Sequence, residues 1–540
     1  MSFLADMKRY GRFAWGLRSF LRHTISLEEA QATVRRRMAE RESNFLRLVE
    51  HGIFGYRRSP YLPLLKLARC ELGDVRSMVR TKGLEETLRA LRRAGVYVSF
   101  EEFKGREPMV RDGQVIHVQA GDFDNPHLGQ YYQAESGGTT GAMTRVAIDL
   151  DHLVDHSPHM LLTENAHGLI GVPTAIWHGV PPDSTGLQCL LLCVRFGHVS
   201  KRWFTPVTSR DLRRSLRHCL ATPYLFSIIS IGRLLGVPMP WPEPVSLDQA
   251  ATVARWAVET IKTHGACLIR THVSKALRVC IAARDQGLDL TGATFLGGGE
   301  PPTAAKVQGM IQVGARWIPM YWFTEAGCVG QGCARPADGN DIHLFKDGLA
   351  LTQYPRKVPG SEITVLAFNF TTLLPSTPKL LLNVESDDYG VIETRSCGCP
   401  LEAYGFTDHL RHIRSFRKLT GEGATLVGST MIHILEEVLP ARFGGGPLDY
   451  QLLEEEDEQG LTRLSLLISP KIQIADETAV VAALLDALGQ TDGTADSARA
   501  LWKQARTIRV ERMEPIWTGR GKLMPLHLAK APHSASVPKP

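Results

Sequence analysis

A glycine- and hydroxyl-rich hexapeptide, Ser136-Gly137-Gly138-Thr139-Thr140-Gly141, carries the first recognisable chemistry in this chain. Glycine lets the backbone approach a ligand, and backbone N–H groups and side-chain hydroxyls donate hydrogen bonds to an anion. The segment therefore predicts a loop around a polyphosphate, with a Gly/Thr-rich surface turn as the simpler alternative. No Gly-Lys-Ser/Thr follows it, which excludes the P-loop of nucleoside triphosphatases.

Two further blocks follow in the sequence: Gly297-Gly298-Gly299-Glu300-Pro301-Pro302 and Met320-Tyr321-Trp322-Phe323-Thr324-Glu325. An aromatic face suits a nucleotide base, and a hydroxyl and a carboxylate at a strand end suit phosphate and Mg²⁺. Taken alone, either block could equally be core packing around a buried Tyr and Trp.

The three blocks together, in this order and spacing, resemble the adenylate-forming superfamily. The likeness is greatest to its phenylacetate–CoA ligase branch and to acyl-protein-synthetase relatives, and it spans about residues 133–526. Two positions depart from the pattern: Met143 stands where proline is usual, and Trp322 replaces a small glycine.

The resemblance implies a role for each matching residue. Gly299, Glu300 and Pro301 would lie along adenine, and Tyr321 would pack on its ring. Thr324 would contact phosphate, and Glu325 would help to hold Mg²⁺.

A carboxylate further along the chain matches the family's ribose-binding aspartate. Asp388, directly before Tyr389-Gly390, is the preferred candidate and Asp387 the alternative. A carboxylate suits a vicinal diol because it accepts two hydrogen bonds at once. An acidic turn at a strand end is the simpler interpretation.

The C-terminal part resembles the family's hinge and its mobile lysine loop. Arg417 is the nearest basic residue to the hinge position, where the usual Gly-Arg-x-Asp is not legible, so we treat it as a nucleotide-binding candidate. Lys522, in Thr518-Gly519-Arg520-Gly521-Lys522, corresponds to the adenylation lysine. A cation on a glycine-flanked loop can reach a carboxylate and the α-phosphate, and it stabilises charge that develops as pyrophosphate leaves.

Four further residues resemble a structural metal site of some members of the branch: Cys333, His343, Cys397 and Cys399. Three thiolates and one imidazole form a closed tetrahedral shell for Zn²⁺. Cys328 is a competing ligand, and free buried thiols are the alternative to zinc.

The elements that must position these residues fall into an α/β pattern. Residues 27–49 and 84–95 predict helices, and residues 96–121 predict short strands. Strands expected at 187–194, 266–271, 293–296 and 317–321 alternate with helices, which is typical of a layered α/β domain. After residue 415 the pattern changes to a hairpin (449–454 and 461–469), two helices (477–488 and 495–505) and a strand (507–513).

These changes of pattern predict four parts. Residues 1–130 are a helical N-terminal part of the large domain, and residues 131–415 are an ATP-binding α/β core. Residues 416–528 are a small α+β domain, mobile by the resemblance, and residues 529–540 are a disordered tail. The fold class is thus α/β, with a large multi-layer adenylation domain and a small C-terminal domain.

Composition fits a soluble globular protein. The chain has 540 residues, 44% hydrophobic and 22% charged, with a formal net charge of +6 spread along the sequence, so we expect no nucleic-acid partner. The interrupted apolar stretch 224–241 predicts no transmembrane segment. Ten cysteines are too few for a disulfide scaffold, which favours a cytoplasmic location.

The resulting expectation is an AMP-forming acid–thiol ligase that uses ATP and Mg²⁺. A small aryl or fatty carboxylic acid would form an acyl-adenylate and pass to CoA, to a carrier-protein thiol, or to another thiol or amine. The resemblance leaves structural Zn²⁺ and a homodimer open. The alternative is a non-catalytic relative that binds a nucleotide or an acyl-adenylate and acts as a partner module.

Overall fold

The computed structural model describes most of the chain. The described residues are 13, 15–129, 131–135, 145–181, 183, 185–207, 216–300, 302–357, 364–415, 420–421, 424–425, 428–456, 462–489, 508–518, 521–524 and 526–528. Ser136–Gly141, Pro301, Arg417, the helix expected at 495–505 and the tail from 529 lie outside them.

The N-terminal part is helical, as its sequence predicts. Its helices are α2 (Leu27–Ala39), α3 (Arg41–Leu48), η1 (Val49–Phe54), α4 (Tyr61–Leu67), α5 (Leu72–Lys82), α6 (Leu84–Arg93), α7 (Phe100–Phe103) and η2 (Ala120–Phe123). The capping box of Ser26 and Glu29 starts α2, and α6 is followed by Gly95 with a positive φ, which ends the helix. The short strands expected near 96–121 are β1 (Met109–Arg111) and β2 (Gln114–Ile116).

Among the described residues, the largest sheet has twelve strands in the order β13-β14-β15-β16-β12-β11-β10-β9-β8-β5-β6-β7. Its parallel half contains β5 (Thr174–Trp177), β6 (Arg202–Thr205), β7 (Pro242–Pro244), β8 (Cys267–Arg270), β9 (Ala293–Gly298) and β10 (Arg316–Phe323). Its antiparallel half contains β11 (Gly327–Gly332), β12 (Ile342–Leu344), β13 (Leu349–Lys357), β14 (Thr364–Thr372), β15 (Val384–Thr394) and β16 (Asp408–Ser415). A separate pair, β3 (Tyr131–Glu135) and β4 (Arg145–Asp149), flanks residues 136–144.

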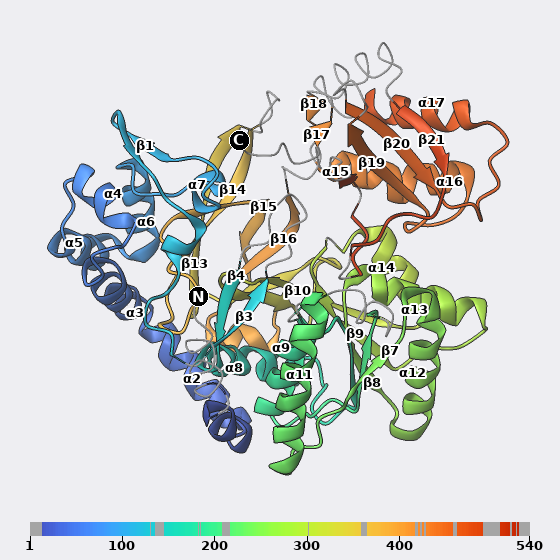
Figure 1. Cartoon of the computed structure of the whole chain (residues 1–540), viewed down its shortest axis with the longest axis horizontal. Coiled ribbons are helices and arrows are strands. Elements are labelled where there is room, and N and C mark those ends of the chain that lie inside the picture. Colours follow the sequence, from blue (N-terminus) through green and yellow to red (C-terminus); the bar gives the residue numbers. More distant parts are fainter. Residues whose placement is uncertain are drawn as a thin grey trace, which may run out of the picture.

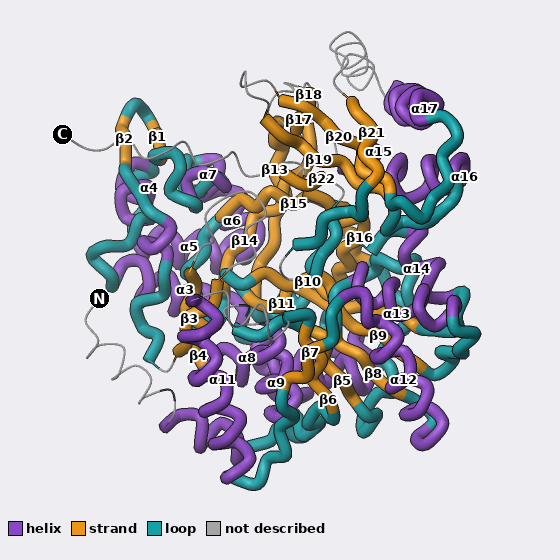
Figure 2. The backbone as a smooth tube through the Cα atoms, turned by 45° about the vertical axis from the view of Figure 1, so that its right-hand side comes forward, coloured by secondary structure: helices purple, strands orange, loops and turns teal. Residues whose placement is uncertain are grey.

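Helices cover both faces of the parallel half (Figures 1 and 2). One face packs against α8 (Leu150–Ala166), α9 (Thr185–Arg195) and α11 (Leu216–Leu234). The other packs against α12 (Ala250–His264), α13 (Val273–Asp285) and α14 (Ala304–Ile311). This layering confirms the predicted α/β class.

The strand predicted at 187–194 is wrong, because these residues form most of α9. Nearly every side chain of the segment is buried against the sheet, so its apolar residues show no amphipathic spacing. A continuous apolar run does not distinguish a buried strand from a buried helix.

The C-terminal unit has its own four-stranded sheet, ordered β21-β20-β19-β22. Its strands are β19 (Tyr450–Glu456), β20 (Thr462–Ile468), β21 (Ile508–Arg512) and β22 (Leu526–Leu528), and β19 and β20 form the predicted hairpin. The helical segments α15 (Gly428–His433), η5 (Ile434–Val438), α16 (Leu439–Phe443) and α17 (Glu477–Gly489) belong to the same unit, and a hydrophobic cluster links them to its strands. Figure 1 shows this unit next to α14. A small pair, β17 (Thr420–Gly421) and β18 (Ala424–Thr425), precedes it.

None of the helices in the described residues is long and apolar enough to cross a membrane.

Candidate nucleotide and metal sites

The glycine block 297–299 lies where β9 ends between β8 and β10. A Cβ on Gly297 would stand 1.6 Å from the Thr271 carbonyl oxygen, and one on Gly298 would stand 1.9 Å from the Met320 carbonyl oxygen. Gly299 has φ +83°, which favours glycine. The block is therefore required both for sheet packing and for the turn that ends the strand.

Tyr321 and Asp388, predicted to contact adenine and ribose, lie against each other. A bulge at Val329 of β11 lies opposite Tyr321 and Trp322, which pair with Gly330 and Cys328. The Tyr321 hydroxyl donates to Asp388 Oδ2 at 2.6 Å. Burial, with Asp388 beside it, holds the pKa of Tyr321 well above its usual value, so the phenol stays protonated and keeps donating. The alternative residue, Asp387, instead accepts from the Ser415 hydroxyl at 2.9 Å.

Tyr321 lies next to the glycine block. Met320 pairs with Gly298 in the parallel register of β10 and β9. Tyr321 and Gly299 each come one residue later, so the aromatic block and the glycine block end at the same edge of the sheet.

Glu325, the predicted Mg²⁺ ligand, pairs with a lysine that sequence reasoning missed. Lys104 Nζ lies 2.8 Å from Glu325 Oε1, and both side chains are largely buried. Lys104 follows α7, far from every motif in the sequence, so no local signal marks it. Thr324 is half-buried and directly precedes this carboxylate.

Lys522 reaches the glycine block from the C-terminal unit. The Lys522 N–H donates to Thr518 Oγ1 at 3.0 Å, and the Thr518 N–H donates to the Lys522 carbonyl at 2.9 Å. A Cβ on Gly299 would stand 2.8 Å from Lys522 Nζ. The structure therefore brings the predicted lysine loop and the glycine block into contact.

Glu300 is tied into a buried polar network. Its carboxylate accepts from the Ser274 N–H at 3.1 Å and from the Ser274 hydroxyl. Lys306 Nζ lies 3.6 Å from Glu300 and 2.8 Å from Glu436 of η5. This network joins the core to the C-terminal unit beside the glycine block.

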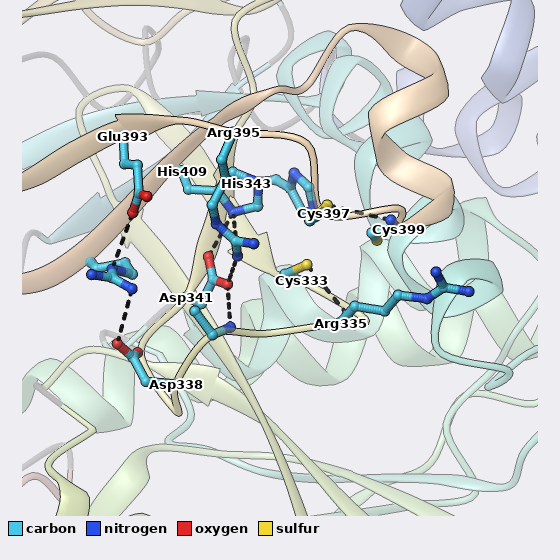
Figure 3. A network of polar contacts seen from close by, with 12 residues as sticks. Cys333, Arg335, Asp338, Asp341, His343, Glu393, Arg395, Cys397, Cys399 and His409 are labelled. Atoms are coloured by element: carbon cyan, nitrogen blue, oxygen red, sulfur yellow. Dashed lines mark hydrogen bonds and ion pairs between the residues drawn. The ribbon is translucent and has the colours of Figure 1, made fainter.

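The four predicted metal ligands converge (Figure 3). One ligand atom from each of Cys333, His343, Cys397 and Cys399 lies within 4.8 Å of the others. Cys333 follows β11, His343 lies on β12, and the other two lie in the loop between β15 and η4 (Pro400–Tyr404). Cys328 is not in this group; its thiol lies 3.7 Å from the Gly330 carbonyl oxygen.

Backbone amides point at the sulfur atoms of this cluster. Ala334 N–H donates to Cys399 Sγ at 3.4 Å, and Arg335 N–H donates to Cys333 Sγ at 3.3 Å. The Cys399 N–H likewise donates to Cys397 Sγ at 3.3 Å. Such donors stabilise thiolates, the form of cysteine that binds metal.

The imidazole of His343 is oriented as a ligand. Its Nδ1 donates to the Phe406 carbonyl at 2.7 Å, which leaves Nε2 as a lone pair 3.8 Å from Cys397 Sγ. Next to it, His409 Nδ1 lies 2.6 Å from Asp341 Oδ1, and Arg395 pairs with the same carboxylate. Three sulfurs and one free imidazole nitrogen fit the donor set of Zn²⁺.

Comparison with known proteins gives structural likeness only. No family model matches the chain, and no curated protein sequence does. The structure is similar to 2-hydroxyisobutyryl-CoA ligase in complex with 2-HIB-AMP and CoA (15% identity, TM-score 0.45), covering 94% of this chain and 93% of that one. It is also similar to the anthranilate CoA ligase AuaEII in complex with anthranoyl-AMP (13% identity, TM-score 0.43), covering 86% of this chain and 79% of that one. A third similar structure is that of the amide bond synthetase McbA from Marinactinospora thermotolerans (12% identity, TM-score 0.39), covering 94% of this chain and 98% of that one.

Proposed function

We propose that this chain belongs to the adenylate-forming superfamily and activates a carboxylic acid with ATP. One observation carries the proposal. Residues matched to the family from separate parts of the sequence meet at one edge of the sheet, with Lys522 against Gly299 and Tyr321 bonded to Asp388. Gly298 of β9 and Met320 of β10, which directly precede Gly299 and Tyr321, are partners in the sheet.

In this proposal the base and the ribose lie at the Tyr321–Asp388 end of the site. Asp388 accepts from the ribose hydroxyls, and the hydrogen bond from Tyr321 fixes its carboxylate. Thr324 donates to phosphate. Lys104 holds Glu325 through Oε1, and the other oxygen is the donor suited to Mg²⁺, which supplies charge neutralisation on the phosphates when bound.

Lys522 carries the chemistry of the first half-reaction. The acid's carboxylate attacks the α-phosphorus, the bond to pyrophosphate breaks, and the Lys522 ammonium stabilises the negative charge that develops. The second half-reaction transfers the acyl group from AMP to a thiol or amine; CoA and a carrier-protein thiol are the acceptors that the sequence resemblance suggests. A cytoplasmic location and a homodimer stay predictions.

Carboxylate-dependent ATP–pyrophosphate exchange tests the activation step. We expect a panel of acids to contain at least one that supports exchange, and Lys522→Ala to reduce it by about 10²–10³-fold. Lys471→Ala, a lysine of the same unit whose side chain is 76% exposed, is the control and retains the rate. Nucleotide binding without exchange for any acid would instead support the non-catalytic alternative.

We also propose that Cys333, His343, Cys397 and Cys399 hold a structural zinc ion. The site would join β11, β12 and the loop after β15, the strand that carries Asp388. Metal analysis of the purified protein should find one zinc per chain. Cys399→Ala should lose it, whereas Cys328→Ala, a buried thiol on β11 outside the group, should keep it.

A further inference from the structure

Lys275, in the first turn of α13, is a buried cation that the activation chemistry above does not use. Its side chain is 0% exposed, and Nζ donates to the Trp177 carbonyl at 2.7 Å. Within the described ranges Nζ has no second acceptor and no carboxylate within ion-pair distance. Because an ammonium group has three N–H donors, two of them lack a protein partner there.

Two buried imidazoles lie beside this lysine. The rings of His178 and His272 are 4.6 Å apart. Burial, with the charges of Lys275 and Lys522 nearby, holds the pKa of each imidazole well below its usual value, so both are neutral. We call Lys275, His178 and His272 the Lys275 cluster.

The hydrogen-bonding roles in the Lys275 cluster are defined by one contact. His272 Nδ1 lies 3.1 Å from the Gly298 carbonyl oxygen, which can only accept, so Nδ1 carries the proton and Nε2 is an acceptor. Neither His272 Nε2 nor His178 Nδ1 finds a partner in the part of the chain that the structure describes. Buried polar atoms without partners are uncommon in folded proteins and call for an explanation.

Lys522 lies next to the Lys275 cluster. A Cβ on Gly299 would be 2.8 Å from Lys522 Nζ and 2.9 Å from His272 Nδ1. A Cβ on Gly521, next to Lys522, would be 3.0 Å from Lys275 Cδ. Two carboxylates act on Lys275 through their charge, Asp183 and then Glu300, and neither is within ion-pair distance of Nζ among the described residues. Glu300 already accepts from Ser274 and pairs with Lys306, as described above.

We propose that the Lys275 cluster binds a hydroxyl group of the acid substrate, and that this substrate is therefore a short hydroxy acid. The proposal rests on the proposed function, because it takes Lys522 as the residue that faces the reacting carboxylate. A hydroxyl accepts one hydrogen bond and donates another. It would accept from a Lys275 N–H and donate to His272 Nε2.

The position of the Lys275 cluster next to Lys522 limits where the hydroxyl stands. It must be on one of the first carbons after the carboxylate. An unsubstituted chain or ring in the same place would leave the buried donors and the acceptor unpaired, so it should react less efficiently than the hydroxylated acid.

ATP–pyrophosphate exchange with matched acids tests this directly. For wild-type protein we expect kcat/KM for 2-hydroxy or 3-hydroxy acids to exceed that for unsubstituted acids of equal chain length by about 10³-fold or more. Lys275→Met keeps a chain of similar length without N–H donors, and should reduce this ratio to about 10-fold or less. Lys262→Met, an exposed lysine of α12, is the matched control and should keep the wild-type ratio.

The outcomes separate this proposal from adenylation itself. Exchange at equal kcat/KM for hydroxylated and unsubstituted acids would overturn the hydroxyl site and leave adenylation intact. A wild-type protein that exchanges with no acid at all would overturn both. The wild-type comparison requires no variant, so it decides the question even when Lys275→Met does not fold.

Discussion

The proposed metal-ligand cluster (Cys333, His343, Cys397 and Cys399) and the Lys275 cluster are both largely buried groups of titratable side chains, but they differ in the partners of their polar atoms. Around Cys333, His343, Cys397 and Cys399, backbone amides donate to the sulfurs and a carbonyl fixes the imidazole tautomer. In the Lys275 cluster, His178 Nδ1, His272 Nε2 and two ammonium hydrogens of Lys275 have no partner among the described residues.

Under the two proposals above, this difference separates a structural metal site from a substrate-binding site. At the Cys/His cluster the protein supplies all four ligands of the proposed zinc site, so removing one member leaves an incomplete coordination shell. A functional site keeps unsatisfied groups for a ligand, and the free protein is less stable because of them. Substitution should therefore lower the free energy of unfolding at the first cluster and raise it at the second.

The largest effect is expected from protonation of buried histidines. Burial holds the pKa of His152, His156, His178 and His272 below 6.5. A depressed folded-state pKa means that only the unfolded chain takes up protons below pH 6.5, so stability is full above that pH and falls as the pH decreases. At about 1.4 kcal/mol for each group, the free energy of unfolding should drop by about 5 kcal/mol between pH 7.5 and 5.5. Urea denaturation at the two pH values measures it; equal midpoints would show that these imidazoles are not buried neutral.

Loss of a metal ligand should have the next largest effect. Cys399→Ala is expected to lower the free energy of unfolding by about 4 kcal/mol, the range for losing a bound metal. Thermal unfolding with and without a chelator measures this change, and the chelator should affect wild type but not the variant. A wild-type protein indifferent to the chelator and free of zinc would make the cluster a group of free thiols.

Lys275→Met should change stability in the opposite direction. Burial lowers the pKa of Lys275 to about 7, so near neutral pH this buried side chain is only partly charged. Replacing it by an apolar side chain of similar length removes the cost of burying this group, so we expect the protein to gain about 1–3 kcal/mol of stability. Urea denaturation at pH 7 should show this gain. A loss of stability comparable to that of Cys399→Ala would place Lys275 among the structural residues.

Tyr321→Phe should give the smallest effect. Its hydroxyl is satisfied by Asp388, so this part of the nucleotide site resembles the metal-ligand cluster and not the Lys275 cluster. Removing the hydrogen bond should destabilise the protein by about 1–2 kcal/mol and raise the KM for ATP more than that for the acid. An unchanged KM for ATP would argue against a ribose role for Asp388.

The sequence by itself determined much of this protein. Periodicity and turn residues predicted the N-terminal helices, the hairpin of β19 and β20, and the strands β8, β9 and β10. Family-like motifs singled out Tyr321, Asp388 and Lys522, which the fold brings to one edge of the sheet. The four residues of the Cys/His cluster were also identifiable, because their residue types and order resemble a known metal site, and the fold brings their ligand atoms within 4.8 Å of one another.

Only the tertiary structure decided the rest. Helix α9 was mistaken for a strand because full burial removes the periodicity that distinguishes the two. Lys104 and Lys275 carried no signal, since a lysine becomes part of a site through contacts distant in sequence: Glu325 lies 221 residues after Lys104, and Trp177 lies 98 residues before Lys275. Local sequence pattern specifies elements and motifs, but burial and contacts distant in sequence decide which charged side chains are paired, as Lys104 is with Glu325, and which are buried with few partners, as Lys275 is.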